Sequence, residues 1–567
     1  MKASKKTSKT AVMLTLSLAV ALTSACTKES PSGSTETTPA SSGSPKASEA
    51  VKADPFGKYE TPIEFSTVRK EVEGLKFPAG QSLDKNIWTD SFEADLGIKV
   101  VNKWKVAANQ YDQKLNVSII SDDLPDFLQV DSRQLQLLLE GGKLKDLTEA
   151  FDKYASPLLK QAKPKEDLDA ATFKGKLMAI PAQSGGIDNA PMLWVRVDWL
   201  KKLNLPEPKT ANDLFTIIDA FTNKDPDGNG KKDTFGLNLN KDIYSGFSGI
   251  DGFLNMYRAY GYNVNGNTMW VKDKEGKLGY GSIQPEMKQA LAKLQELFKA
   301  GAIDPEFAVY DPAKSAENEM NNKTGIHFGT FSTIGWPLRD FKKAVPEGEW
   351  KPYPIPSIDG NPARPMAVTA APSSFYIVNA KSKNPEALVK LLNYYYEKVV
   401  GPKQEPQKFH STSIDGVAYT MFQYSPVSGG LPNTNLKAQI NVSDALKTND
   451  VSKLTPEEKN YFDAIQLYKK GDPAQYFRDR TFGPEGSYSV IGHYANNKLP
   501  LFNEFYGPPT KTMVDKGSTL KDMEIQTITK IITGSSIDEF DKFVKDWKSL
   551  GGDKIIEEVN AWYANKK

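Results

Sequence analysis

The sequence holds a single cysteine, Cys26, so the chain cannot be stabilised by a disulfide bond within itself. The stability of its 567 residues must therefore come from hydrophobic cores. Hydrophobic residues make up 39% of the chain and charged residues 25%, which are ordinary values for a globular protein. The length after the N-terminal region is enough for two large lobes.

The residues before Cys26 have the composition of a secretory signal peptide. Four lysines precede the apolar run Ala11–Leu22, and small residues follow it. The run is shorter than the about 20 apolar residues that span a bilayer, and we expect no transmembrane helix later in the chain. Residues Thr23–Cys26 resemble a lipobox in which Thr23 replaces the usual leucine. We therefore predict removal of a lipoprotein signal peptide (1–25), acylation of Cys26, for example with palmitate, and anchoring at the extracytoplasmic face of the cell membrane.

Residues 26–54 are rich in Ser, Thr, Pro and Gly and almost free of apolar side chains, which predicts a disordered tether. The precursor carries a formal charge of +2, and loss of the four signal-peptide lysines would give −2. Neither value favours a nucleic-acid partner. We expect a monomeric globular body at the end of this tether.

Short β-rich runs alternate with helical patterns along the rest of the chain. Ile98–Ala107 and Pro125–Val130 have the character of strands, and a helical pattern follows at Arg133–Glu140. Such alternation favours α/β layers and a mostly parallel sheet.

Several helices are predicted from caps and apolar faces. Residues 210–213, which begin with a threonine, are typical of a cap for a helix over Leu214–Thr222. A proline opens the amphipathic pattern Glu286–Ala300. Aromatic side chains at helical spacing over Ser536–Tyr563, interrupted by two glycines, predict a terminal pair of helices.

The segment 225–233 has the spacing of a calcium-binding loop. Oxygen-bearing side chains stand at loop positions 1, 3, 5 and 9, glycine stands at position 6, and position 7 would offer its backbone carbonyl. Gly236 stands where an acidic residue usually completes the site. A plain Asp/Asn/Gly turn is the alternative, and we favour a structural calcium ion because a turn needs no such spacing. The predicted ligands are Asp225, Asp227, Asn229, Lys231 and Asp233.

The sequence gives little support for an enzyme. Its three histidines, His327, His410 and His493, lie far apart, and it has no zinc-protease, nucleophile-elbow or phosphate-loop motif. A glycoside hydrolase or lyase is harder to exclude, because two catalytic carboxylates have no fixed spacing in sequence.

Aromatic residues beside Gly, Pro or Asn are frequent in predicted loops. Flat rings suit the apolar face of a sugar, and nearby amides and carboxylates suit its hydroxyl groups. A core aromatic is the more common explanation for any single one, but the set favours carbohydrate. On this ground Trp88, Phe253 and Tyr506 are candidate ligand-binding residues.

A series of short motifs resembles one family over nearly the whole mature chain. The chain resembles an extracellular solute-binding protein (family 1) of oligosaccharide-type ABC importers, close to the LipO-like lipoproteins of Gram-positive bacteria. The matching segments are Leu124–Phe127, Gly142–Thr148, Ile180–Pro181, Leu193–Leu200, Asp225–Asp233 with Phe235–Leu237, and Phe543–Gly552.

The resemblance implies a periplasmic-binding-protein-like fold, in which two α/β lobes close by a hinge on a ligand in a central cleft and present it to the ABC permease subunits. It implies a first lobe over 55–183 and 368–400, and a second over 184–367 and 401–567. It places Gln129 and Asp131 beside the cleft, and Phe331 and Trp336 where relatives stack an aromatic ring on the ligand. In some calcium-carrying relatives an acidic residue follows Asp233, where this chain has Thr234.

The expected function is therefore capture of an oligosaccharide without catalysis. A surface-anchored glycosidase or lyase, and a receptor for a non-sugar ligand such as a peptide, remain alternatives. The nominated loops contain no arginine–lysine pair, which favours neutral glycans.

Overall fold

The structure, a computed structural model, describes residues 53–72, 74–182, 186–262, 268–366, 374–401, 403–415, 417–507 and 509–565. The expected signal peptide, Cys26 and the tether up to residue 52 lie outside the described residues. No helix among the described residues is both long enough and apolar enough to cross a membrane.

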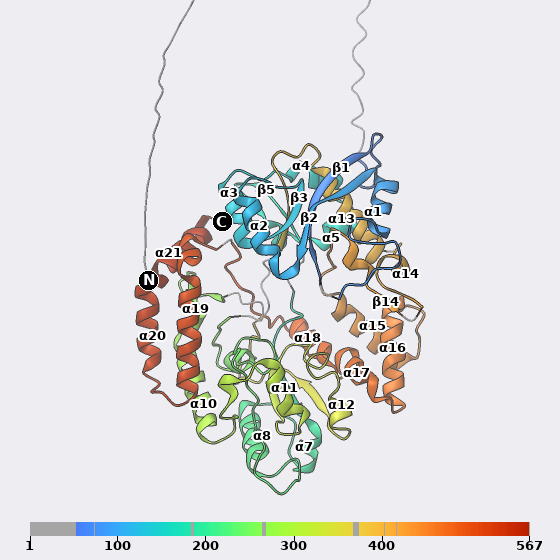
Figure 1. The fold of residues 1–567 in the computed structure, drawn as a ribbon. Helices are drawn as coiled ribbons and strands as arrows, with labels where there is room; N and C mark the ends of the chain where they lie inside the picture. The colour runs from blue at the N-terminus through green and yellow to red at the C-terminus, as the bar shows by residue number, and fades with distance from the viewer. Residues whose placement is uncertain are drawn as a thin grey trace, which may run out of the picture. The chain divides into compact units, whose positions relative to one another are not determined.

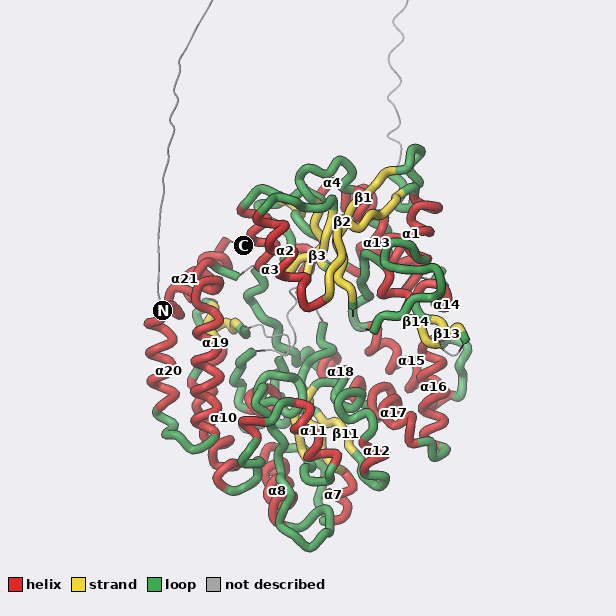
Figure 2. Tube along the Cα trace, viewed as in Figure 1, coloured by secondary structure: helices red, strands yellow, loops and turns green. Residues whose placement is uncertain are grey.

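The fold combines short strands with many helices (Figures 1 and 2). The strands are β1 (Ile63–Glu71), β2 (Ile98–Ala107), β3 (Phe127–Asp131), β4 (Thr172–Phe173), β5 (Lys176–Leu177), β6 (Ile180–Pro181), β7 (Met192–Arg196), β8 (Trp270–Lys272), β9 (Leu278–Tyr280), β10 (Ile326–Gly329), β11 (Trp350–Tyr353), β12 (Ser374–Val378), β13 (Thr412–Ile414) and β14 (Val417–Tyr419).

The helices fall into three groups along the chain. Those of the N-terminal part are α1 (Ile87–Ser91), α2 (Tyr111–Ile120), α3 (Ser132–Glu140), α4 (Thr148–Tyr154), α5 (Pro157–Ala162) and α6 (Lys165–Asp169). Those of the middle are α7 (Val197–Lys202), α8 (Ala211–Asn223), α9 (Asp251–Met256), α10 (Pro285–Lys299), α11 (Pro312–Met320), α12 (Phe341–Ala344), α13 (Glu386–Val399) and α14 (Pro406–Phe409). The last group is α15 (Thr434–Thr448), α16 (Pro456–Lys469), α17 (Tyr476–Phe482), α18 (Ser487–Asn496), α19 (Lys511–Ile532), α20 (Glu539–Trp547) and α21 (Asp553–Asn565).

Strand pairing is less parallel than the sequence pattern predicts. β1 and β2 run parallel, with Ile63 opposite Ile98. The sheets β3-β12-β6 and β10-β7-β11, however, are antiparallel throughout. β12 enters from far along the chain in the direction opposite to β3 and β6, and β10 and β11 return beside β7 in the same way. The expectation of a mostly parallel sheet is therefore wrong, whereas β2 has the bounds that its pattern predicts.

The first core joins segments that are far apart in sequence. Its buried side chains run from Phe65 on β1 to Ala182 after β6, and resume from Phe375 on β12 to Val427. In Figure 1, β1, β2 and β3 lie beside one another. Residues between 409 and 427 pack into this core, although the sequence-based division assigns 401–567 to the second lobe.

Two further cores meet at strand β7. Leu193 and Val195 belong to the second core, which is formed mainly by α8, α10, α19 and α20. Met192 and Trp194, on the other face of the strand, belong to the third core, which α15–α18 complete. Successive side chains point to opposite faces of a strand, so a fully apolar strand can serve two cores.

Local sequence explains where the longer helices begin and end. Thr210 is the N-cap of α8, and its hydroxyl accepts a hydrogen bond from the backbone N–H of Asp213 at 3.1 Å. α10 starts at Pro285, and Gly301 follows it with a φ of 75°. Both predicted helices are confirmed, and α8 begins at Ala211, earlier than predicted.

The C-terminal helices pack on the second core through aromatic side chains. α20 lies beside α19 (Figure 2), and its Trp547 stacks on Tyr280 with ring centroids 4.4 Å apart. A π-helical turn over 548–552 joins α20 to α21, and Gly551 within it has a φ of 136°. The predicted terminal helix pair, with its break at the glycines, is confirmed.

Candidate ligand-binding site

A cavity of about 360 Å³ opens where β1 and β3 end. Its lining includes residues 67–70 of β1, residues 129–131 of β3, the first part of β12, and the segment 422–428. Ligands of open α/β folds bind outside the carboxyl ends of the strands, where loops and helix N-termini converge. The cavity therefore lies where the architecture favours a binding site.

Gln129 and Asp131, nominated from the sequence, both line this cavity. Gln129 lies opposite Tyr376 in the sheet, and its side-chain amide donates to the Ser374 hydroxyl at 3.0 Å. Asp131 is the N-cap of α3 and accepts a hydrogen bond from the backbone N–H of Gln134 at 2.7 Å. The Asp131 carboxylate stays exposed and the amide is half-buried, so both side chains can offer hydrogen-bonding groups to the cavity.

The sequence analysis did not nominate Arg69, which lies on the wall of the same cavity. Its guanidinium donates to the backbone carbonyls of Tyr424 and Gln423, each at 3.0 Å. Burial lowers the pKa of Arg69 to about 10, which still leaves the group charged at neutral pH. Its place near the end of a cleft-forming strand was the available signal, but the nominations concerned loops only.

Aromatic side chains provide the apolar part of the cavity wall. Tyr111, Tyr376 and Phe422 line it. The Tyr376 hydroxyl accepts a hydrogen bond from the backbone N–H of Ser428 at 2.8 Å, and burial raises the pKa of this tyrosine. Rings and polar groups on one wall match the amphipathic surface of a sugar.

Phe331 and Trp336 lie in the turn that follows β10. The Phe331 ring packs against Tyr488 with centroids 4.9 Å apart, and the Trp336 side chain is 62% exposed. Asp188 lies near the Tyr488 hydroxyl, and burial raises the pKa of its carboxyl. The turn thus presents one free indole ring beside a half-buried phenyl ring.

The other three aromatic nominations lie elsewhere. Trp88 is fully buried in the first core, where its indole N–H donates to the Met421 carbonyl at 2.8 Å, and Phe253 is fully buried in the second core. Neither ring presents a face to a ligand in this conformation. Tyr506 lines a separate cavity of about 10 Å³ beside α3, and its ring meets Trp562 edge-on.

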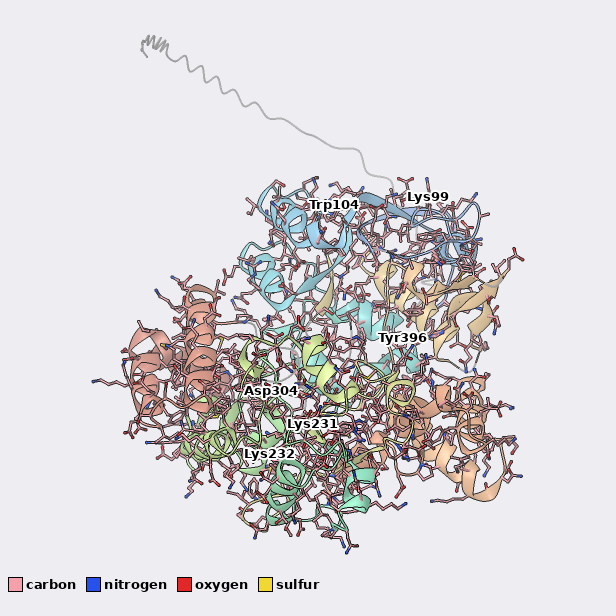
Figure 3. The ribbon with its side chains drawn as sticks, turned by 60° about the horizontal axis from the view of Figure 1, so that its bottom comes forward. Lys99, Trp104, Lys231, Lys232, Asp304 and Tyr396 are labelled. Atoms are coloured by element: carbon pink, nitrogen blue, oxygen red, sulfur yellow. The ribbon has the colours of Figure 1, made fainter. Side chains whose placement is uncertain are left out.

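The predicted calcium loop is tightly hydrogen-bonded. Asp225 accepts from the backbone N–H groups of Gly228 and Gly230, each at 3.0 Å. The Asn229 amide donates to Asp227 at 2.7 Å and to Asp233 at 3.0 Å. The side chain of Lys231 is exposed (Figure 3).

The carboxyl groups of this loop are crowded. A hydrogen bond from the Asp227 side chain lowers the pKa of Asp225, whereas burial and the neighbouring Asp225 raise the pKa of Asp227. A cation between them would relieve this repulsion, so the donor set fits a hard metal ion. At Gly236 a Cβ would collide with the Ile218 carbonyl, so the chain has no room there for the usual twelfth ligand. Nowhere among the described residues are three or more His, Cys, Asp or Glu side chains arranged around one point.

Comparison with curated proteins identifies relatives along much of the chain. It is 24% identical to lipoprotein LipO of Bacillus subtilis over 85% of this chain and 90% of LipO. It is 26% identical to the polygalacturonan/rhamnogalacturonan-binding protein YtcQ of Bacillus subtilis over 70% of this chain and 72% of YtcQ. It is also 26% identical to the fructooligosaccharide ABC transporter substrate-binding protein FusA of Streptococcus pneumoniae over 46% of this chain and 52% of FusA.

Solved structures share the fold at low sequence identity. An extracellular solute-binding protein from Bifidobacterium longum subsp. infantis aligns with a TM-score of 0.59 and 18% identity, over 89% of this chain and 98% of that one. An EF-hand mutant of FusA from S. pneumoniae in complex with fructo-nystose aligns with a TM-score of 0.54 and 18% identity, over 89% of this chain and 99% of that one. The fold is the two-lobed α/β fold of these proteins.

The family model for bacterial extracellular solute-binding proteins matches residues 76–401, which is more than half of the chain. This range includes strands β2 to β12, and with them the part of the cavity lining that comes from α2, β3, α3 and β12. The chain belongs to the bacterial extracellular solute-binding protein family.

Proposed function

We propose that the protein binds an oligosaccharide and delivers it to the permease of an ABC importer. The observation that carries the proposal is the cavity at the ends of β1 and β3, where aromatic rings and hydrogen-bonding side chains share one wall. FusA and YtcQ, two relatives, are by name carbohydrate-binding proteins, which supports the same class of ligand.

In this proposal the two lobes close on the ligand from opposite sides. Gln129 and Asp131 contribute hydrogen bonds from the first lobe, and the exposed Trp336 contributes a stacking ring from the second, with Phe331 behind it. The changes in core membership support lobe boundaries near residues 183 and 368, and extend the first lobe beyond residue 400 to about Val427. Ligand contacts with both lobes would favour the closed state.

The proposed receptor has no catalytic step. The acidic residues of the cavity wall, Asp112 and Asp131, are both exposed. A glycosidase acid is usually held in an apolar pocket that raises its pKa, and neither residue has such surroundings. These surroundings favour binding over glycoside hydrolysis or lysis.

The loop 225–233 is proposed to hold a structural calcium ion. Asp225, Asp227 and Asp233 would supply carboxylates, while Asn229 and the Lys231 carbonyl would supply neutral oxygens. The crowding of Asp225 and Asp227 supports this assignment, as does the EF-hand named in the FusA structure. Calcium would clamp the loop next to α8 and take no part in ligand recognition.

Thermal unfolding of residues 52–567 tests both assignments. The panel contains neutral fructo- and gluco-oligosaccharides, acidic oligogalacturonates, and peptides, each measured with calcium and with a chelator. A ligand that binds only the folded state stabilises it by mass action and so raises the unfolding midpoint. At a ligand concentration of 100 times Kd the free energy of unfolding increases by about 2.7 kcal/mol. We expect a shift with one glycan class, and chromatography of the same samples should show the glycan intact.

The possible outcomes separate the alternatives. Shortened glycan would establish an enzyme, and a shift with peptides alone would establish a non-sugar receptor. Calcium should raise the midpoint of the unmodified protein but not that of Asp227→Asn. An equal calcium response in both proteins would remove the loop from the assignment and leave the glycan result unaffected.

A further inference from the structure

We propose that the cavity takes acidic oligosaccharides, and that Arg69 recognises a carboxylate of the ligand. This inference rests on the proposed function and specifies its substrate class. It departs from the expectation of neutral glycans, which considered only the nominated loops. Arg69 lies on strand β1, at the end where the cavity opens.

The guanidinium of Arg69 has N–H donors that form no hydrogen bond with the described residues. An arginine has five N–H donors in a planar fork, and the structure shows only two hydrogen bonds from Arg69, both to the backbone carbonyls of residues 423 and 424. These two contacts fix the plane of the fork against the segment 422–428. The described residues offer its remaining donors no acceptor, so they are available to a planar carboxylate.

Two arginines with little exposed side-chain surface have carboxylate partners. Arg196 is 1% exposed and contacts Asp198 at 2.6 Å. Arg480 contacts Glu349, and also Asp479 at 3.2 Å. Arg69 forms no ion pair with any described residue, although burial lowers its pKa. The Arg69 side chain is only partly buried and lines the cavity, so a carboxylate of the ligand can reach it and supply the counter-ion.

Two nearby carboxylates are already engaged, whereas Asp112 in the cavity lining is exposed. Asp84, the acidic residue whose charge acts on Arg69, is bound by Lys105 and by the Asn102 amide at 2.8 Å. Asp131 caps α3. Lys70 lies on the same wall, with its ammonium group 5.5 Å from the centre of the Tyr111 ring. A ligand in the cavity would therefore lie close to a second positive charge.

The test compares an acidic ligand with its neutral methyl ester. Calorimetry measures Kd for a short oligogalacturonate and for its methyl ester, using the unmodified protein, Arg69→Gln and Arg69→Lys. We expect the unmodified protein to prefer the acid by roughly 10- to 100-fold, the range for a hydrogen-bonded charge pair. Arg69→Gln should lose this preference and keep its affinity for the ester, and Arg69→Lys should retain part of the preference.

Arg478→Gln is the matched control, because Arg478 stacks on Tyr461 and Phe477 and does not line the cavity. This variant should keep the preference for the acid. Equal or tighter binding of the ester or of a neutral glycan by the unmodified protein would overturn the inference and leave the receptor function intact. A preference that survives in Arg69→Gln would overturn the role of Arg69. If no oligosaccharide binds the unmodified protein, the proposed function fails as well.

Discussion

At the scale of single residues, Glu524 makes an unusual contribution to stability. It is fully buried on α19, where it accepts hydrogen bonds from the hydroxyls of Tyr280 at 2.8 Å and Tyr244 at 3.1 Å. Burial raises its pKa from 4.5 to about 7. The folded state therefore binds this proton more tightly than the unfolded state, so the stabilisation is complete below pH 4.5 and is lost as pH rises towards 7.

We predict that Glu524→Gln flattens this pH dependence, because the amide keeps an acceptor and cannot ionise. Urea unfolding of both proteins at pH 5 and pH 8 provides the measurement. The unmodified protein should lose up to roughly 3 kcal/mol more than the variant over this interval. Asp251 is also buried with a raised pKa and contributes the same trend to both proteins, so the difference isolates Glu524. Parallel pH profiles would contradict the prediction.

The sequence could suggest the chemistry of single residues but not their burial. Trp88 was nominated because Asn86, two residues before it, suggested a loop. Asn86 instead caps α1, and the indole of Trp88 points into the first core. Gly252, beside Phe253, suggested a second loop. Gly252 instead lies within α9, where a Cβ would collide with the Phe328 ring. A glycine or asparagine marks a turn, a cap or a close contact equally well, and only the tertiary partner distinguishes them. Gln129 and Asp131 were nominated through the family resemblance, and both line the cavity.

At the scale of secondary-structure elements, the cap of α8 has a measurable effect. The Thr210 hydroxyl and the Asp213 side chain each bond the other's backbone N–H, which satisfies two free donors at the helix start. Thr210→Ala should lower the free energy of unfolding by about 1 kcal/mol, whereas Thr210→Ser should cost much less. Urea unfolding followed by circular dichroism measures both. Equal losses in the two variants would show that the methyl group, and not the hydrogen bond, matters.

Helices and strands were predictable where the pattern of a single chain segment determines them. α10 and β2 follow their own apolar patterns, and the structure confirms both. The direction of pairing was not predictable, because it depends on where β12 returns relative to β3, more than 200 residues away in sequence. Local pattern determines an element, whereas its partner depends on how the whole chain passes between the cores.

At the scale of the whole molecule, we propose that Cys26 anchors the body to the outer face of the cell membrane through a lipid. The family is extracellular, and LipO, a relative, is by name a lipoprotein. In Cys26→Ser the acceptor sulfur is lost, so most of the protein should move from the membrane fraction to the medium. Fractionation with an antibody against the body measures this. Thr23→Ala is the control and should stay with the membrane. Membrane retention of Cys26→Ser would require a different anchor.

The discontinuous first core also determines when folding can finish. Phe65 and Val427 are packed in one cluster, and β12 is the central strand between β3 and β6. During synthesis from the N-terminus, β3 and β6 emerge long before the strand that must join them. The first core therefore stays incomplete until most of the polypeptide has been made. If the chain is exported through a narrow channel, this delay would help, because no finished domain would block its passage.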